Sequence, residues 1–293
     1  MHKSGFVNII GNPNVGKSTL MNALVGERLS IITSKAQTTR HRIMGIVNGE
    51  DFQIVYSDTP GILKPSYKLQ ESMMKFVKGA VSDADVILYV TDTVEQSDRS
   101  AEIVERIAAS GIPTIVVVNK IDLTTPDKLE ALVEKWHAIL PNAEIAPASA
   151  KEGFNIGGIF DSILRLLPEG EPFYPKDTLT DKTLRFFASE IIREKILLNY
   201  DKEIPYCCEI AIDSYKEEPT IDRIAATIYV TRDSQKGIII GHRGEMLKKV
   251  GTQARIDLEK FLGKKVFLEL FVKVGGDWRN DERQLRRFGY EQD

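Results

Sequence analysis

One motif near the start of the chain constrains the fold more than any other feature. Residues 11–18 read GNPNVGKS, which fits the pattern G-x-x-x-x-G-K-[ST] of a phosphate-binding loop. The apolar residues 6–10 precede the loop as a strand, and residues 18–25 follow it as a helix. Glycines let backbone N–H groups turn toward a β-phosphate, Lys17 can reach the β- and γ-phosphates, and Ser18 can bind Mg²⁺. The motif therefore predicts a strand–loop–helix unit that binds a nucleoside triphosphate. The residues expected to contact the nucleotide here are Gly11, Asn12, Pro13, Asn14, Val15, Gly16, Lys17, Ser18 and Thr19.

A second motif follows another apolar stretch, residues 52–56. It consists of Asp58, Thr59, Pro60 and Gly61, in the pattern D-x-x-G. A carboxylate at the end of a strand can hold Mg²⁺ through water, and the Gly61 N–H can bond a γ-phosphate and move once that phosphate leaves. Asp-x-x-Gly also suits an ordinary turn, so the motif gains its meaning from its order in the chain.

Two further motifs predict which base is bound. Asn119, Lys120 and Asp122 form N-K-x-D after the hydrophobic residues 113–118, a stretch typical of a central parallel strand. An ionised Asp122 can accept hydrogen bonds from N1–H and N2–H₂ of guanine, a donor pair that adenine lacks. One strand–helix unit later come Ser149, Ala150 and Lys151, where a backbone N–H can contact guanine O6. Together these motifs predict a guanine nucleotide.

Residues 1 to about 170 resemble a translation-factor-type GTPase domain in the order of all these motifs. The resemblance implies GTP and GDP as ligands, slow intrinsic hydrolysis, and catalytic roles for Lys17, Thr39 and Gly61. Residues 34–41 correspond to the first switch, in which one threonine ligates Mg²⁺ only when the γ-phosphate is present. Thr39 is favoured and Thr38 is the alternative. The implied metal ligands are Ser18, Thr39 and Asp58.

The residue after D-x-x-G departs from many regulatory GTPases, which have a glutamine that orients the attacking water. Ile62 has no hydrogen-bonding group, so water must be positioned otherwise or hydrolysis must be slow. His41 is a conceivable base, although a histidine in a basic loop is more often simply solvated. Asn14 resembles the ligand of a potassium ion in GTPases with such a hydrophobic substitution, where K⁺ supplies the charge of an arginine finger.

Composition bounds the class of protein. A chain of 293 residues with 42% hydrophobic and 28% charged residues suits two globular domains. No apolar run approaches the roughly 18 residues that suggest a membrane span, and the first strand begins too early for a signal peptide, so a cytoplasmic location is expected. Cys207 and Cys208, the only cysteines, are expected to point to opposite faces of a strand as buried thiols.

Charge is distributed unevenly over the second half. Residues 232–287 contain fourteen Lys or Arg against eight Asp or Glu, whereas residues 201–222 contain seven acids against two lysines. The overall net charge of −3 therefore conceals a basic surface that could bind an anion. Three prolines between residues 167 and 175 indicate a semi-extended linker. The expected domains are residues 1–168, a linker at 169–180, and residues 181–293 with a basic C-terminal segment.

The second half shows the pattern helix, strand, strand, helix, helix, strand. Two helices meet at Gly241-His242-Arg243-Gly244, preceded by three isoleucines. This order and the basic rim resemble a KH domain of the prokaryotic variant, in which the loop backbone approaches phosphates closely. We expect an apolar floor for bases and basic contacts to the backbone of single-stranded RNA. The expected RNA-binding residues are Ile239, Ile240, Gly241, His242, Arg243, Gly244, Lys248 and Lys249.

A GTPase domain followed by one KH domain, with Gln37-Thr38-Thr39-Arg40-His41 in the first switch, resembles the Era family over nearly the whole chain. The expected fold class is α/β: a P-loop GTPase domain with a mostly parallel sheet, plus a smaller α+β type II KH domain. Family resemblance implies binding near the 3′ end of small-subunit ribosomal RNA and a role in assembly of the small subunit. We also expect a monomer that does not bind DNA.

Two alternatives stay open at this point. Nucleotide could be a bound ligand with incidental turnover, because of Ile62. The basic C-terminal face could instead contact anionic lipid at the inner face of the membrane, as in a membrane-associated or regulatory GTPase.

Overall fold

The computed structural model describes residues 1–94 and 100–290. The chain divides into two compact units, one of residues 1–66 and 70–181, the other of residues 67–69 and those from 182 onward. Among the residues described, no helix combines the length and apolarity that crossing a membrane requires.

The first unit is built on a six-stranded sheet with the order β2-β3-β1-β4-β5-β6. Only β2 is antiparallel to its neighbour; the other pairs are parallel. Every residue of β4 and β5 is buried, which explains their continuous apolar sequences. The strands are β1 (Lys3–Gly11), β2 (Ile43–Asn48), β3 (Phe52–Asp58), β4 (Val86–Asp92), β5 (Thr114–Asn119) and β6 (Glu144–Pro147).

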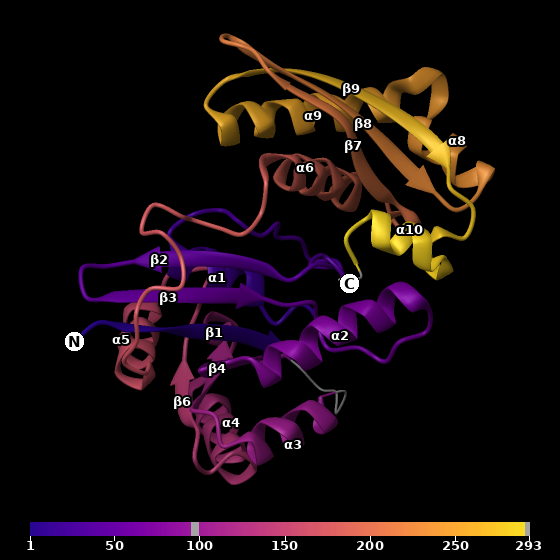
Figure 1. The fold of residues 1–293 in the computed structure, drawn as a ribbon. Coiled ribbons are helices and arrows are strands. Elements are labelled where there is room, and N and C mark those ends of the chain that lie inside the picture. The colour runs from indigo at the N-terminus through magenta and orange to yellow at the C-terminus, as the bar shows by residue number, and fades with distance from the viewer. Residues whose placement is uncertain (95–99, 291–293) are drawn as a thin grey trace. The chain divides into compact units, whose positions relative to one another are not determined.

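Helices cover both faces of this sheet (Figure 1). On one face lie α1 (Lys17–Val25) and α5 (Ile156–Leu166). On the other lie α2 (Lys68–Ser82), α3 (Ala101–Ser110) and α4 (Pro126–Ile139). The short helix η1 (Ile121–Leu123) follows β5. Parallel strands bring their carboxyl ends to one edge, so Gly11, Asp58 and Asn119 gather there.

The expected linker is held along the first unit. Gln53 Oε1 accepts hydrogen bonds from the backbone N–H groups of Phe173 and Tyr174 at 2.7 and 2.9 Å. The Ile46 N–H donates to Leu179 O at 2.8 Å. Residues 173–180 are therefore attached to β2 and β3 by backbone hydrogen bonds.

The second unit has a three-stranded sheet of β7 (Glu209–Glu217), β8 (Ile221–Val230) and β9 (Lys265–Val274). β7 is antiparallel to β8, with a bulge between Ile212 and Ser214, and β9 is parallel to β8. Apolar side chains from one face of the sheet form a core with the helices. Those helices are α6 (Leu184–Asn199), α7 (Ile204–Cys207), α8 (Asp233–Ile240) and α9 (Glu245–Leu262). The C-terminal segment adds η3 (Trp278–Asn280) and α10 (Glu282–Arg287), and η2 (His242–Gly244) lies between α8 and α9.

The predicted fold class is confirmed, with one local error. Cys207 and Cys208 do not occupy a strand: Cys207 ends α7 and Cys208 follows it. Both thiols are buried, and both sulfurs contact the carbonyl oxygen of Ile204, at 3.3 and 3.1 Å. The Pro205 ring at the start of the helix favours this turn over a longer strand.

Candidate functional site

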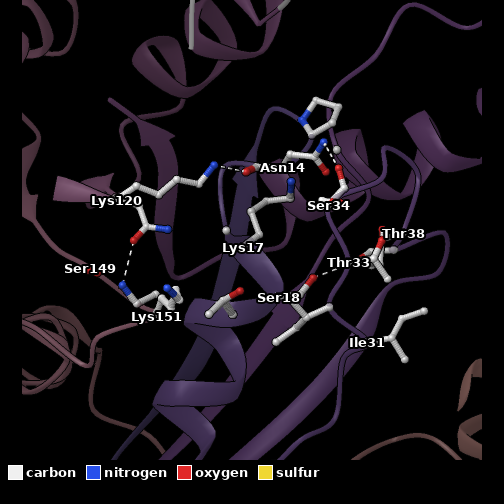
Figure 2. A pocket seen from close by; sticks show the side chains of 18 of the residues that line it. Asn14, Lys17, Ser18, Ile31, Thr33, Ser34, Thr38, Lys120, Ser149 and Lys151 are labelled. Carbon is white, nitrogen blue, oxygen red and sulfur yellow. Dashed lines mark hydrogen bonds between the residues drawn. The ribbon is translucent and has the colours of Figure 1, made fainter. Parts of the chain in front are cut away.

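A cleft of about 790 Å³ opens at the carboxyl edge of the first unit's sheet (Figure 2). Its size is within the usual range for small-molecule sites. The loops after β1, β5 and β6 contribute to it, together with the segment before β2. Its lining includes Pro13, Asn14, Gly16, Lys17, Ser18, Thr19, Ile31, Ile32, Thr33, Ser34, Gln37, Thr38, Thr39, Gly61, Asn119, Lys120, Asp122, Leu123, Ser149, Ala150 and Lys151.

The loop after β1 presents backbone N–H groups and one ammonium group to the cleft. Lys17 opens α1, and its Nζ donates to Asn12 O at 2.8 Å. Gly16 has φ +97°, and a Cβ there would lie 2.2 Å from Nδ2 of Asn119. That amide in turn donates to Val15 O at 2.8 Å. Only glycine fits at residue 16, and the α1 N-terminus is left open to an anion.

Three oxygen-bearing side chains meet beside Lys17. Ser18 Oγ donates to Asp58 Oδ2 at 2.6 Å and lies 2.9 Å from Thr39 Oγ1. Asp58 is fully buried, and its Oδ1 accepts no hydrogen bond. Burial raises the pKa of Asp58, against the lowering effects of the Ser18 hydrogen bond and the Lys17 charge. A cation would relieve this cost, and hard oxygen ligands suit Mg²⁺. The residues fit the implied metal.

Thr38, the alternative ligand, is engaged elsewhere. Its Oγ1 donates to Lys35 O at 2.6 Å and lies 2.6 Å from Thr33 Oγ1. Among the described residues no group of three or more His, Cys, Asp or Glu could hold a metal, so hydroxyl groups have to complete the set around Asp58.

The D-x-x-G segment packs directly on the phosphate-binding loop. Thr59 Oγ1 donates to Ile9 O at 2.7 Å, and the Ile62 N–H donates to Gly11 O at 3.1 Å. A Cβ on Gly61 would lie 2.7 Å from Cα of Pro13, so the close approach requires glycine. The Ile62 side chain is buried and offers nothing polar to a water in the cleft.

The opposite end of the cleft has the geometry expected for a base. Asn119 Oδ1 accepts from the Ala150 N–H at 2.9 Å, which joins the loops after β5 and β6. Ser149 Oγ donates to Asp122 Oδ1 at 2.6 Å and orients that carboxylate. Asp122 Oδ2 is thus available for a pair of donors such as those of guanine, and the neighbouring Lys151 side chain is exposed.

Lys120 joins the base end to the phosphate end. Its backbone is left-handed, with φ 61°, and its Nζ donates to Asn14 O at 2.5 Å and to Asp92 Oδ2 at 2.6 Å. Asn14 is left-handed too, with φ 65°, and its Nδ2 donates to Ser34 O at 2.9 Å (Figure 2). The Asn14 amide therefore links the phosphate-binding loop to the first switch.

Most residues predicted for the nucleotide site line this cleft. The predicted residues that do not line it are Gly11, Asn12, Val15, Asp58, Thr59, Pro60 and Ile62. Motif reasoning missed Asp92, which orients Lys120, and the apolar residues Ile31, Ile32 and Leu123, which line the cleft. The only sequence signal for Asp92 was weak: it is an acidic residue at the end of an apolar strand.

Motif reasoning also missed Arg42, which lies between the first switch and β2. Its guanidinium donates to both carboxylate oxygens of Asp83, at 2.5 and 3.0 Å. It also donates to Ser57 Oγ at 2.6 Å and to Asn8 Oδ1 at 3.1 Å. One side chain thus fixes the ends of the first switch, of β3 and of α2.

The glycine loop of the second unit projects its two central side chains outward. Gly241 has φ 72°, and a Cβ there would lie 2.7 Å from Cγ of Met246. Gly244 has φ 81°, and Arg243 is left-handed with φ 50°. His242 and Arg243 are exposed, as are Lys248 and Lys249 on α9. The backbone is therefore open to a close approach by phosphate.

Of the two isoleucines expected to form an apolar floor for bases, Ile239 and Ile240, only Ile240 is partly accessible. Ile239 is fully buried in the core, and its carbonyl accepts from the Tyr200 hydroxyl at 2.6 Å, so its side chain cannot face a ligand. Ile240 is half-buried, and Ile238 is the exposed member of the three. The prediction for Ile239 is wrong because helical periodicity turns its side chain toward the core between the helices and the sheet.

Comparison with known proteins gives the same two units. Residues 6–120 match the family described as 50S ribosome-binding GTPase, and residues 203–279 match the KH domain. GTPase Era of Syntrophus aciditrophicus (strain SB) is 46% identical over all of this chain and 96% of its own length.

Two solved structures are also similar over their full length. One is Era in complex with MgGDPNP and nucleotides 1506–1542 of 16S ribosomal RNA, at 42% identity and TM-score 0.95, covering 100% of both chains. The other is an Aquifex aeolicus Era variant bound to GDP·AlF4⁻, at 42% identity and TM-score 0.95, covering 99% of this chain and 100% of that one.

Proposed function

The chain belongs to the Era family of GTPases, and we propose from this membership that it couples a guanine-nucleotide switch to small-subunit ribosomal RNA. It is a GTPase. The observation that carries the proposal is the presence in one chain of a complete guanine-nucleotide cleft and an exposed G-x-x-G loop whose two glycines both have positive φ, 72° and 81°. The expected domains, residues 1–168 and 181–293, are proposed to be the two functional parts.

In the nucleotide cleft, Lys17 neutralises the β- and γ-phosphates, and Asp122 and Ala150 select guanine. Ser18, Thr39 and Asp58 would hold Mg²⁺, which would supply positive charge to neutralise the phosphates during hydrolysis. The 2.9 Å contact between Ser18 and Thr39 supports Thr39 over Thr38 as the ligand from the first switch. Loss of the γ-phosphate removes the bond to the Gly61 N–H and releases both switches.

Potassium is proposed as a second cation. Asn14 Nδ2 donates to Ser34 O of the first switch at 2.9 Å, so rotation of the amide by 180° would turn Asn14 Oδ1 toward the same carbonyl and give an ion two oxygen ligands. Ile62 leaves the position of the usual glutamine without a polar group, and K⁺ would supply charge at the transition state instead. Replacing K⁺ by Na⁺ should slow hydrolysis, and Asn14→Ala should abolish that difference. Equal native rates in the two salts would contradict the role of potassium.

The RNA partner is proposed from the glycine loop and from the solved relative. A KH cleft grips about four unpaired nucleotides with its loop backbone against phosphates. Exposed His242, Arg243, Lys248 and Lys249 suit that role. The family description for residues 6–120 names the 50S subunit, whereas the relative that is similar over its full length holds 16S RNA. Because that relative also shares the KH unit, we favour the small subunit and a role in its assembly.

We propose a cytoplasmic monomer that does not bind DNA, with peripheral contact to the inner face of the membrane as a secondary property of the basic C-terminal segment. Pelleting with anionic liposomes at physiological salt tests that contact. A strong membrane interaction that persists at such salt would favour a membrane-associated GTPase.

The proposal as a whole is tested by GTP turnover with and without small ribosomal subunits, and by crosslinking to ribosomal RNA in the GTP- and GDP-bound states. We expect the RNA contact to depend on which nucleotide is bound. Identical crosslinks in both states would indicate a binding module in which turnover is incidental.

A further inference from the structure

The outer face of the second unit's sheet carries two exposed aromatic rings. Strand residues alternate between faces, and the helices cover the face that contains Ile228 and Val272. Phe267 and Phe271 point the other way, and they are 43% and 50% exposed. The C-terminal segment covers the other end of this outer face, where Phe288 packs on Tyr229. The two phenylalanines lie beyond it.

Cations accompany the two rings. Arg223 lies opposite Phe267 in the β8–β9 register, with its guanidinium carbon 5.3 Å from the ring centroid. Its Nε also donates to Glu218 Oε1 at 3.0 Å, which offsets part of its charge. Lys265 and Lys273 occupy the same face at either end of β9, and both are exposed. Aromatic rings stack on unpaired bases, and flanking cations attract the phosphates between them. A sheet surface that carries both aromatic and basic side chains can therefore bind single-stranded nucleic acid. We call this surface, made by Arg223, Lys265, Phe267, Phe271 and Lys273, the platform.

The acids of this face are mostly engaged. Glu209 Oε2 accepts from the Tyr290 hydroxyl at 2.5 Å, and Asp213 Oδ2 accepts from Thr227 Oγ1 at 2.6 Å. Glu269 stands on β9 between the two phenylalanines and is exposed. A carboxylate there can accept a hydrogen bond from an exocyclic amino group of cytosine or adenine, which uracil lacks.

The platform is separate from the glycine loop. Ile239 and Val250, on the helices that flank that loop, pack on the inner face of the sheet, so the loop and the phenylalanines lie on opposite sides. A KH cleft accommodates about four nucleotides. The RNA in the solved relative extends from nucleotide 1506 to 1542, far more than one cleft can hold. A partner of this length has nucleotides beyond the cleft that a second surface could contact.

We propose that the outer face of the β7–β8–β9 sheet is a second binding surface for unpaired nucleotides, with Phe267 and Phe271 as stacking residues and Glu269 as a reader of base amino groups. This proposal rests on the proposed function, because it requires that the protein binds RNA. The two residues are four apart on one strand, about 13 Å, so they would contact bases that are not adjacent in the RNA.

Ultraviolet crosslinking of the full-length protein to the 1506–1542 segment of 16S RNA locates both contacts at once. Trypsin releases the two phenylalanines in one peptide, residues 266–273, and the glycine loop in another, residues 237–243. We expect crosslinks in both peptides. A crosslink in 237–243 alone would contradict the platform and leave the proposed function intact, whereas no crosslink in either would contradict both.

Variants separate base stacking from other uses of an apolar surface. Phe267→Leu with Phe271→Leu keeps the surface apolar but removes the rings. It should weaken binding of the long RNA about fivefold or more and leave a six-nucleotide probe of the KH cleft unaffected. The matched control is Leu198→Ala with Ile256→Ala, which removes exposed apolar groups from helices and should change neither affinity.

Two further results would overturn the proposal. Unchanged affinity of a folded leucine variant for the long RNA would exclude stacking. Sedimentation that shows the native protein to self-associate, and a Phe267→Ser, Phe271→Ser variant that loses the apolar surface not to, would assign this face to contact between copies. Glu269→Gln should reduce the preference for cytosine-rich over uracil-rich RNA, and an unchanged preference would remove Glu269 from the surface.

Discussion

Asp122→Asn should change the nucleotide specificity of the cleft from guanine to xanthine. The native carboxylate accepts from two guanine donors, whereas an amide presents N–H where the N1–H or N2–H₂ group points. Xanthine has a carbonyl oxygen in place of the amino group and can accept from that amide. The substitution preserves shape, because Asn Oδ1 can still accept the 2.6 Å hydrogen bond from Ser149 Oγ.

The magnitude follows from the number of bonds and from solvent exposure. Hydrogen bonds to a charged group contribute about 1.5–3 kcal/mol each. Asp122 is exposed in the nucleotide-free cleft, so its carboxylate is hydrated before binding and the lower value applies. Two bonds at that value give about 3 kcal/mol, or about a 10²-fold loss in GTP affinity.

Competition binding with GTP and XTP measures this change. The ratio of the two affinities should reverse in Asp122→Asn. Ser149→Ala is the matched control: it removes the hydrogen bond that orients Asp122, and it should lower GTP affinity about tenfold or less without favouring XTP. A guanine preference that survives in a folded Asp122→Asn protein would refute the assignment of Asp122 as the residue that reads the base.

Three other substitutions test other parts of the first unit. Gly61→Ala places a Cβ 2.7 Å from Cα of Pro13, so the two segments must separate; GTP affinity should fall more than GDP affinity, and single-turnover hydrolysis should slow about tenfold or more. Burial raises the pKa of Asp58, so the folded state is favoured at low pH, where this carboxyl group is protonated. The free energy of unfolding then falls as the pH rises through the raised pKa of Asp58. Asp58→Asn should therefore raise the free energy of urea unfolding of the nucleotide-free protein by about 1–2 kcal/mol at pH 7, and by less at pH 4. The same variant should lose the additional stability that the native protein gains from Mg²⁺ and nucleotide. Arg42→Met leaves Ser57 Oγ and Asn8 Oδ1 without their donor and should cost about 2 kcal/mol or more of unfolding free energy; a cost below about 0.5 kcal/mol would show that Arg42 does not fix the switch ends.

The fold and the nucleotide motifs were predictable because their chemistry is local in sequence. The phosphate-binding loop needs glycine at residue 16, where Asn119 leaves no room for a side chain. Requirements of this kind fix the residue type at fixed positions of a motif, so the motif can be recognised in the sequence. Apolar stretches then place each motif at the end of a parallel strand. The alternation of β7, β8 and β9 was readable for the same reason, since one face of each strand is buried.

Contacts between distant segments were not predictable. Asp92 and Arg42 act on residues 28 and 41 positions away, and neither belongs to a motif. Whether an isoleucine faces a core or a ligand depends on helix rotation, which decided Ile239 against the expectation. Cys207 was misplaced because a single helical turn has no period to detect.

The most direct test of the proposed RNA contact is RNA binding by His242→Asp with Arg243→Asp. These substitutions place two carboxylates beside phosphates and alter neither glycine. Filter binding of a short oligonucleotide from the 3′ end of 16S RNA should show greatly weakened binding, with GTP affinity and thermal stability nearly unchanged. Native binding should fall with salt, with a slope of about −0.7 per phosphate neutralised.

The matched control is Lys202→Asp with Lys260→Gln, which changes the net charge of the same unit equally at other exposed positions. It should retain most of the native RNA affinity. Equal RNA binding by the native protein and the folded His242→Asp, Arg243→Asp variant would contradict the central claim, because the glycine loop would then be only a joint between α8 and α9.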